Sequence, residues 1–193
     1  MSEKIILASQ SPRRKQLLEW AEVDFDIVIQ STDEWYPPSM TVEEIPVFIA
    51  RNKAIAVANK LHTPGSMSPT IVAADTVVVL DNKIIGKPVD RNDAVEILLS
   101  LSGKQHLVIT GVVIRKGDSE LSFADITKVW FNDLTREQLE FYVDKYKPYD
   151  KAGAYAIQEW IGVIGIKSIE GDFYNVMGLP VSRVVAALRQ ING

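Results

Sequence analysis

Thr70–Pro88 reads TIVAADTVVVLDNKIIGKP, and the fold of the chain is organised around this stretch. It opens as an apolar, β-branched run of strand length, which is typical of a strand covered on both faces. A carboxylate, Asp75, interrupts the run directly after two alanines. A charged group in such surroundings is costly unless a cation or hydrogen-bond donors compensate it. Asp75 is therefore either a structural group bonded to a nearby turn or a functional carboxylate.

The same stretch continues as a β-hairpin. The Asp-Asn pair at 81–82 predicts a tight turn between the first strand and a short partner at 83–85. The GKP sequence at 86–88 then places Lys87 between two residues that restrict the backbone. On either side of this hairpin, strands and helices alternate without a repeat or a low-complexity linker. Several of the strands are joined by hairpins, which predicts an α/β fold with a mixed sheet.

The element boundaries follow from periodicity and from helix-start signals. The predicted strands cover 4–8, 25–29, 70–80, 83–85, 106–115, 120–131 and 161–169. The predicted helices cover 12–21, 41–61, 91–101, 135–146 and 180–191. In the second helix, the residues with helical spacing that are expected to face the core are Ile45, Phe48, Ile49, Asn52, Ile55 and Ala56.

The junction LASQSPRR at Leu7–Arg14 carries a possible anion site. Ser11 followed by proline predicts a helix N-terminus, which presents free N–H groups and a partial positive charge. Arg13 and Arg14 in the first turn oppose that dipole unless an anion lies between them. The alternative is that both arginines are simply solvated on a surface turn.

Two further stretches carry charged candidates. The polar loop after the second strand contains Asp33 and Glu34, which are either solvated or part of an acidic site. Arg51 and Lys53 flank the apolar face of the helix at 41–61, so one of them can lean over a cleft.

Composition narrows the classes of function. The 193 residues carry a net charge of −4, which gives no overall basic field for a nucleic-acid polymer. The absence of cysteine and the presence of only two histidines exclude a thiolate nucleophile and disfavour a histidine-rich metal site. No apolar run is long enough to span a bilayer. We therefore expect a soluble, cytoplasmic protein with no membrane partner.

Taken together, the motifs of the chain resemble those of the Maf family of nucleoside-triphosphate pyrophosphatases, whose fold is similar to that of the inosine-triphosphatase group. The motifs run in one order through nearly the whole chain: LASQSPRR, RNKA at Arg51–Ala54, AADTVV at Ala73–Val78, GKP at Gly86–Pro88, HLVITGV at His106–Val112, and YDKAGAYAIQ followed by GDFYNVMGLPV. The resemblance implies a single domain over residues 1–193, an elongated twisted mixed sheet flanked by helices, and two lobes about a central cleft. It also implies a homodimer and a divalent cation, Mg²⁺ or Mn²⁺.

The resemblance assigns roles to individual residues. It makes Asp75 the base that takes a proton from water, and it makes Asp75 and Glu34 the acidic partners of the metal. The residues that match family positions around the triphosphate are Ser9, Arg13, Arg14, Lys53 and Lys87. Lys151 lies in a matched motif and is either a phosphate contact or a structural ion pair.

The segment at 153–158, GAYAIQ, resembles the family branch that acts on dTTP and UTP. Gln158 offers a donor and an acceptor, as the edge of uracil or thymine requires. Thr76 and Arg13 match the other positions tied to substrate choice. The chain departs from the family pattern at Glu159-Trp160, where small residues are usual. These two side chains either narrow the base pocket or fill a gap in the neighbouring core.

The expected function is hydrolysis of dTTP and UTP to the monophosphate and pyrophosphate, in nucleotide-pool house-cleaning and with a possible link to cell-division arrest. One alternative is a nucleotide-binding regulator of septum formation with little turnover, which the set of Asp75, Lys53, Lys87 and Glu34 disfavours. The other is a pyrophosphatase of modified purine triphosphates such as 7-methyl-GTP or ITP, which Gln158 disfavours.

Overall fold

The structure, a computed structural model, describes residues 4–192. Its strands are β1 (Ile5–Leu7), β2 (Phe25–Ile27), β3 (Ile71–Leu80), β4 (Lys83–Ile85), β5 (Gln105–Lys116), β6 (Ser119–Phe131) and β7 (Ile166–Glu170). Its helices are α1 (Pro12–Trp20), α2 (Glu44–Leu61), α3 (Arg91–Leu101), α4 (Arg136–Tyr146), α5 (Trp160–Gly165), α6 (Phe173–Val176) and α7 (Val181–Asn192). Two short 3₁₀ turns, η1 (Pro148–Asp150) and η2 (Ala152–Ala154), follow α4.

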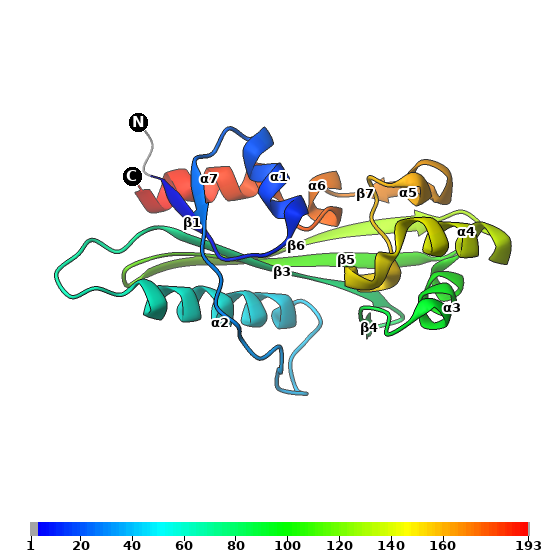
Figure 1. The fold of residues 1–193 in the computed structure, drawn as a ribbon, viewed down its shortest axis with the longest axis horizontal. Coiled ribbons are helices and arrows are strands. Elements are labelled where there is room, and N and C mark those ends of the chain that lie inside the picture. Colours follow the sequence, from blue (N-terminus) through cyan, green and yellow to red (C-terminus); the bar gives the residue numbers. More distant parts are fainter. Residues whose placement is uncertain (1–3, 193) are drawn as a thin grey trace. The chain divides into compact units, whose positions relative to one another are not determined.

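Within the described residues the strands form one seven-stranded sheet of order β2-β1-β3-β5-β6-β7, and β4 pairs with β3 (Figure 1). Strand β1 is parallel to both β2 and β3, whereas β4 is antiparallel to β3 and β7 is antiparallel to β6. The predicted α/β class with a mixed sheet is confirmed. The hairpin between β3 and β4 turns through Asp81 and Asn82, which both have positive φ, 49° and 61°. Asp and Asn tolerate that conformation better than most residues, which explains the turn.

Residues 4–192 group into two compact units. Unit 1 contains residues 4–75, 110–125 and 178–192. Unit 2 contains residues 76–109 and 126–177. Strands β3, β5 and β6 each contribute to both units, and the boundary in β3 falls directly after Asp75.

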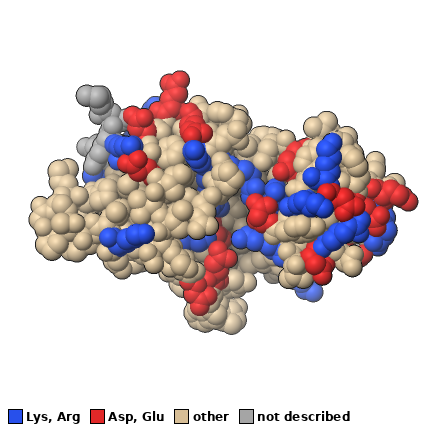
Figure 2. All heavy atoms as spheres, viewed as in Figure 1, with Lys and Arg blue, Asp and Glu red and all other residues tan. Residues whose placement is uncertain are grey.

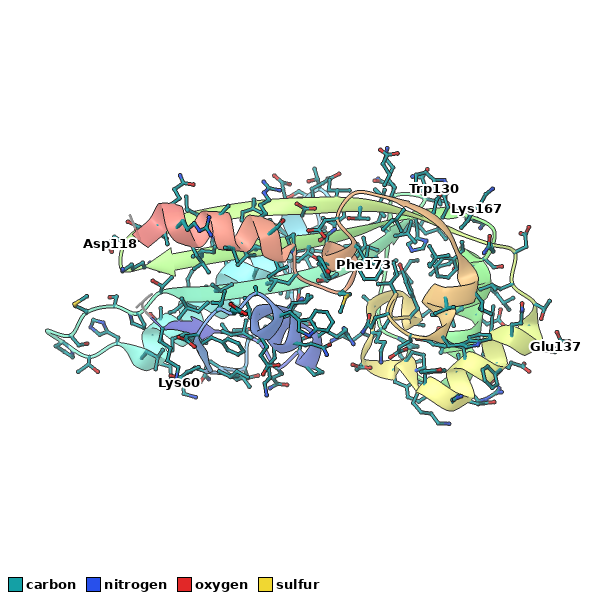
Figure 3. The ribbon with its side chains drawn as sticks, turned by 90° about the horizontal axis from the view of Figure 1, so that it is seen from above. Lys60, Asp118, Trp130, Glu137, Lys167 and Phe173 are labelled. Carbon is teal, nitrogen blue, oxygen red and sulfur yellow. The ribbon has the colours of Figure 1, made fainter. Side chains whose placement is uncertain are left out.

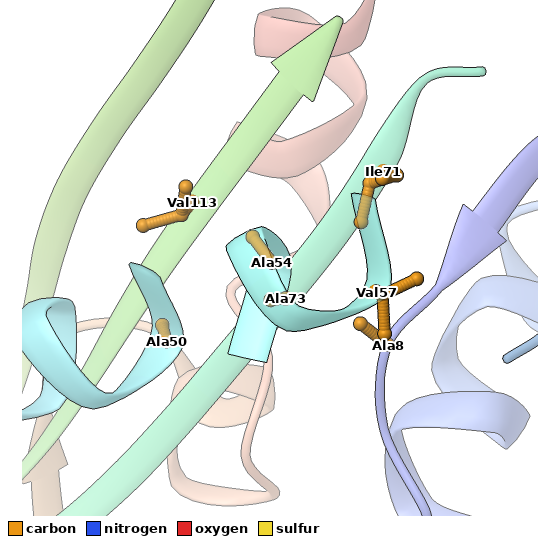
Figure 4. Packing of buried hydrophobic residues seen from close by; sticks show 7 residues of the cluster. All are labelled: Ala8, Ala50, Ala54, Val57, Ile71, Ala73 and Val113. Atoms are coloured by element: carbon orange, nitrogen blue, oxygen red, sulfur yellow. The ribbon is translucent and has the colours of Figure 1, made fainter. Parts of the chain in front are cut away.

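Unit 1 is built by helix α2 packing on strands β3 and β5, with α1 and α7 on the opposite side of the sheet (Figure 1). A cluster of small side chains makes this contact, and Figure 4 shows its members: Ala8, Ala50, Ala54, Val57, Ile71, Ala73 and Val113. The approach is close at Gly111 of β5, where an added Cβ would lie 2.2 Å from the Pro46 carbonyl carbon of α2. The short side chains therefore let the helix lie directly on the sheet.

The predicted core face of α2 is partly wrong. Ile45 and Ile49 are buried as expected, but Ile55 is exposed, while Ala50 and Ala54 are fully buried. The helix start also differs, because α2 begins at Glu44 rather than at Thr41. The capping-box bonds themselves are present: Thr41 N donates to Glu44 Oε2 at 2.8 Å, and Glu44 N donates to Thr41 Oγ1 at 3.4 Å. They close the turn that leads into the helix.

Unit 2 packs α3 against α4 and against the η2 turn. Helix α4 starts with the predicted capping box between Thr135 and Gln138. Glu137 lies in its first turn, as Figure 3 shows, where the helix dipole favours a carboxylate. A buried aromatic cluster forms a second contact in this unit: the rings of His106, Phe131 and Tyr155 meet edge to face, with centroids 5.0 to 5.5 Å apart.

The predicted strand over 161–169 is wrong in its first half. Residues 160–165 form helix α5, and the strand β7 begins only at Ile166. In α5, Ile161 and Gly165 are buried and Val163 between them is 82% exposed, which is the four-residue spacing of a helix. An apolar run this short does not separate helix from strand by composition alone.

Acidic and basic side chains lie intermixed on the face that Figure 2 shows, as expected for a chain with a net charge of −4. Ion pairs such as Arg91–Asp144 and Arg136–Glu96 join elements of unit 2 on the surface. Such exposed pairs add little stability individually.

Candidate active site

The junction between β1 and α1 is fixed by Arg14. Ser11 is the N-cap of α1, with Pro12 at the first helical position, as predicted. The Arg14 guanidinium is buried: its Nε donates to the Gly178 carbonyl oxygen at 2.7 Å, and its Nη1 donates to Ser9 Oγ at 3.1 Å. Ser9 Oγ also accepts from the Ser11 backbone N–H at 3.2 Å. Arg14 is therefore tied into the fold rather than solvated on a surface turn.

The charges around Arg14 bring several predicted residues together. Burial lowers the pKa of the Arg14 guanidinium from its ordinary value, and the positive charge of Arg13 acts in the same direction. The carboxylates of Asp75 and Glu34 oppose this and raise the pKa. Asp75, Glu34 and Arg13 thus all lie within electrostatic reach of Arg14, and the two carboxylates offset the conflict of its charge with the helix dipole.

Lys53 joins the two carboxylates. Its Nζ donates to Asp75 Oδ1 at 2.7 Å and to Glu34 Oε1 at 3.1 Å. The Asp75 side chain is 15% exposed and that of Lys53 is 21% exposed, whereas that of Glu34 is 57% exposed. Three segments that are distant in the sequence, namely β3, α2 and the loop after β2, therefore meet at one ammonium group. The carboxylate in the apolar strand is compensated by this cation.

Six predicted site residues belong to unit 1, and the contacts above connect them: Ser9, Arg13, Arg14, Glu34, Lys53 and Asp75. The neighbouring candidate Arg51 does not join them. It instead donates to Glu120 Oε1 at 2.8 Å and to Ser122 Oγ at 3.1 Å.

The remaining predicted residues, Thr76, Lys87 and Gln158, belong to unit 2. Thr76 follows Asp75 in β3, while Lys87 and Gln158 are exposed on loops. The two loops are connected, because the Gly153 N–H donates to the Gly86 carbonyl oxygen at 3.1 Å. Gly153 has a φ of +69°, and an added Cβ would lie 2.9 Å from Val78 Cγ2, so glycine is needed there.

Lys151 makes the contacts of one of the two roles left open for it, the ion pair. Its side chain is buried, and its Nζ lies 2.8 Å from Asp150 Oδ1 and 3.7 Å from Glu159 Oε1. These contacts favour a structural role for Lys151. Glu159 also accepts a hydrogen bond from the hydroxyl of Tyr142, and Trp160 packs edge to face on Phe141 with ring centroids 4.9 Å apart. The Glu159-Trp160 pair thus contacts helix α4.

Sequence reasoning missed Tyr142, which contacts the segment that carries Gln158. It is fully buried in α4, next to Val143 and one turn after Leu139. Helical periodicity places it in the core, but nothing in the sequence indicates that its hydroxyl contacts a loop so far along the chain.

Asp75 and Glu34 are the two carboxylates that share the Lys53 ammonium group. Among the described residues there is no cluster of three or more metal-ligating side chains. Two carboxylates nevertheless fit Mg²⁺, which is commonly bound by one or two carboxylates together with water and substrate phosphates. The attraction of both groups for one cation is already visible in their contacts with Lys53.

Comparison with known families agrees with this geometry. The family model described as Maf-like protein matches residues 4–191. The chain belongs to the Maf family. Its fold is also that of a solved structure titled "The structure of the Staphylococcus aureus Ham1 protein", with a TM-score of 0.51 and 15% sequence identity over 99% of this chain and 100% of that one.

Curated relatives of this Maf protein carry a more specific name. A protein of Bacteroides thetaiotaomicron named dTTP/UTP pyrophosphatase is 47% identical over 97% of this chain and 96% of its own length. A Cytophaga hutchinsonii protein of the same name is 49% identical over 97% of this chain and 84% of its own length. Among the described residues of the Maf protein, no helix combines the length and the apolar character needed to cross a membrane.

Proposed function

We propose that this Maf protein hydrolyses dTTP and UTP to the corresponding monophosphate and pyrophosphate. The names of relatives at 47% and 49% identity support this reaction. The observation that carries the proposal is Asp75, a carboxylate in an otherwise apolar strand that hydrogen-bonds Lys53 and lies within electrostatic reach of Arg14. A base surrounded by cations is what attack on a polyanionic substrate requires.

In this proposal Asp75 takes a proton from a water molecule. The water oxygen attacks the α phosphorus, and the bond from that phosphorus to the bridging oxygen breaks, so that pyrophosphate leaves with both bonding electrons. Lys53 orients the Asp75 carboxylate through its 2.7 Å hydrogen bond. Most of the protein's contribution is positioning and stabilisation of negative charge.

The triphosphate is bound by cations and by a hydroxyl. In unit 1 we assign this role to Arg13, Lys53 and Ser9, with Arg14 holding Ser9 Oγ and adding positive charge from its buried position. In unit 2 we assign it to Lys87, which is exposed on the loop after β4. Arginine suits phosphate because its planar group donates two parallel hydrogen bonds.

We assign the metal to Asp75 and Glu34, with Mg²⁺ as the expected ion and Mn²⁺ as a substitute. When bound, the ion neutralises charge on the phosphates and makes a coordinated water more acidic. Lys53 bridges the same two carboxylates, and it can donate to a phosphate when they bind a metal instead. Chelation is therefore expected to abolish turnover, and added Mg²⁺ to restore it.

Base selection is assigned to Gln158 and Thr76 of unit 2. The Gln158 side chain is exposed, and within residues 4–192 none of the side chains or backbone groups hydrogen-bonds its amide. Uracil and thymine present one N–H donor between two carbonyl acceptors, so an amide can pair with both types of group. Cytosine has an amino group in place of one carbonyl and an unprotonated ring nitrogen in place of the N–H, so an amide kept in the same orientation no longer pairs with it.

A cytoplasmic location, a homodimer and a role in nucleotide-pool house-cleaning complete the proposal. Free triphosphates as the substrate support the location and the house-cleaning role. The dimer remains a prediction from the family resemblance.

The test is a panel of kcat/KM values for dTTP, UTP, CTP, ITP and 7-methyl-GTP with Mg²⁺. We expect the highest values for dTTP and UTP. A clear preference for 7-methyl-GTP or ITP would replace this proposal by the purine alternative. Tight binding of several nucleotides without turnover would favour a regulator.

A further inference from the structure

The hydroxyl of Tyr142 connects two residues that lie on either side of Gln158. It accepts a hydrogen bond from the Ala156 backbone N–H at 3.2 Å, and it donates to Glu159 Oε2. Tyr142 is fully buried in helix α4, and its ring stacks on that of Tyr146 at a centroid distance of 5.0 Å. One rigid group therefore fixes the backbone two residues before Gln158 and the side chain directly after it.

The negative charge of Glu159 is balanced by a nearby lysine, Lys151. Lys151 Nζ lies 3.7 Å from Glu159 Oε1. Residues 151–159 are also fixed at their beginning by the hydrogen bond from Gly153 N–H to the Gly86 carbonyl oxygen. The whole segment thus has a defined backbone, although the Gln158 side chain itself is exposed.

The backbone around Gln158 matters for base recognition because its side-chain amide carries one donor and one acceptor group. Its oxygen accepts and its nitrogen donates, so a rotation that exchanges the two also exchanges the bases that it recognises. No group in the described part of the chain hydrogen-bonds the Gln158 amide to select one orientation. The bonds on both sides of Gln158 therefore fix where its side chain starts, and the bound base selects which way the amide faces.

We propose that Tyr142 and Glu159 form a positioning pair for Gln158, and that this pair sets how strongly the enzyme discriminates between nucleobases. The inference rests on the proposed function, since it concerns base selection at the same segment. It gives Glu159, a departure from the usual family pattern, a role in substrate choice without direct contact with the base. Turnover is expected to depend on the pair only weakly, because the groups assigned to catalysis, Asp75 and Lys53, are held by a contact of their own.

The experiment uses the full-length enzyme and measures kcat and KM for UTP and CTP. Tyr142→Phe keeps the ring and removes only the hydroxyl. We expect the ratio of kcat/KM for UTP to that for CTP to fall about tenfold, which is the factor that one ordinary hydrogen bond supplies. The value of kcat for UTP should stay within about threefold of wild type, with the loss appearing mainly in KM.

Variants at Glu159 separate positioning from packing. Glu159→Ala is expected to lose discrimination between UTP and CTP, as Tyr142→Phe does. Glu159→Gln keeps an oxygen that accepts from the Tyr142 hydroxyl, so it should retain most of that discrimination. The double variant Tyr142→Phe/Glu159→Ala should lose less than the two single losses combined, because both changes remove the bond between Tyr142 and Glu159. Tyr146→Phe is the matched control: it removes a hydroxyl from the adjacent stacked ring, and the ratio should be unchanged.

The outcomes also separate this inference from the proposed function. Which nucleotide the wild type prefers tests the proposed function alone. The inference is tested by the ratio of kcat/KM for the best nucleotide to kcat/KM for the poorest one, whichever they are. If turnover is absent, the dissociation constants of the α,β-methylene analogues of the same nucleotides take the place of kcat/KM. Variants that melt earlier but keep the wild-type ratio would show that the pair is structural only, and the inference would be wrong.

Discussion

Lys53 is the residue at which the charged contacts of the proposed site in unit 1 meet. One ammonium group contacts the carboxylates of Asp75 and Glu34. Sequence reasoning found all three residues through the family resemblance, but local patterns alone left Arg51 and Lys53 equally good candidates. The distinction needs the tertiary structure, because Arg51 is bound by Glu120 and Ser122, far away in the sequence.

Asp75→Asn should lower turnover by orders of magnitude while nucleotide binding persists. The change keeps the size of the side chain and its ability to accept from Lys53, but it removes basicity. Loss of a general base typically lowers rates by about 10²–10⁴-fold, and the effect should appear in kcat. Steady-state kinetics and the dissociation constant of a non-hydrolysable dTTP analogue would measure both quantities. A folded variant with near-wild-type kcat would show that Asp75 is not the base.

Arg14→Ala should destabilise the fold, and Arg13→Ala should not. Arg14 is buried and donates two charged hydrogen bonds, to Gly178 and Ser9, so its removal should lower the free energy of unfolding by roughly 3 kcal/mol. Arg13→Ala should instead raise KM for dTTP with a change in stability of less than about 1 kcal/mol. Urea unfolding measures the stability of both arginine variants, and steady-state kinetics measures their KM for dTTP. Equal losses of stability in both variants would contradict the assignment.

At the scale of elements, most of the boundaries could be predicted because capping and turn residues mark them locally. Ser11-Pro12, Thr135 with Gln138, and the Asp81-Asn82 turn all lie where the sequence indicated. Residues 160–165 could not be predicted, since this helix is determined by packing. An added Cβ at Gly162 would lie 1.7 Å from the Ile157 carbonyl oxygen, and Gly165 packs on Leu134.

The core face of α2 was misjudged for a related reason. Hydrophobicity ranks Ile55 above Ala54, yet the contact with the sheet uses the alanines because the helix lies so close to β5. Closeness of approach is a property of the packed structure, and Gly111 is its clearest sign.

Gly111→Ala should therefore be strongly destabilising. Its Cβ would lie 2.2 Å from backbone atoms of Pro46 and Val47, so helix α2 would have to move. We expect a loss of about 3 kcal/mol or more, at the upper end for overpacking. Gly86→Ala is the matched control, because an added Cβ there meets nothing within 4 Å. Thermal melts of both variants would decide, and a Gly111→Ala protein as stable as the control would show that α2 and β5 are not in close contact.

At the scale of the whole molecule, the buried cluster around His106 affects stability. Burial lowers the pKa of His106 to about 4 from the ordinary 6.5. Burial also raises the pKa of Tyr155, whose hydroxyl lies 2.7 Å from His106 Nε2. The Tyr155 hydroxyl therefore stays protonated and hydrogen-bonds a neutral imidazole, whose Nδ1 finds no hydrogen-bond partner in the described part of the chain.

This cluster makes stability depend on pH. Between about 6.5 and about 4 the unfolded chain binds a proton at His106 and the folded protein does not, so stability falls as the pH falls through this range. The pKa difference corresponds to about 3 kcal/mol in full. His106→Gln keeps an acceptor for Tyr155 but does not titrate, and its stability should fall less over the same range. Identical pH profiles from urea unfolding would contradict a buried, neutral His106.

The central claim is cleavage between the α and β phosphates, and the ³¹P NMR spectrum of the wild-type protein incubated with dTTP and Mg²⁺ tests it most directly. We expect the triphosphate signals to be replaced by those of TMP and pyrophosphate, with no change when Asp75→Asn is used instead. Formation of TDP and orthophosphate, or dTTP that remains intact with the wild type, would contradict the claim.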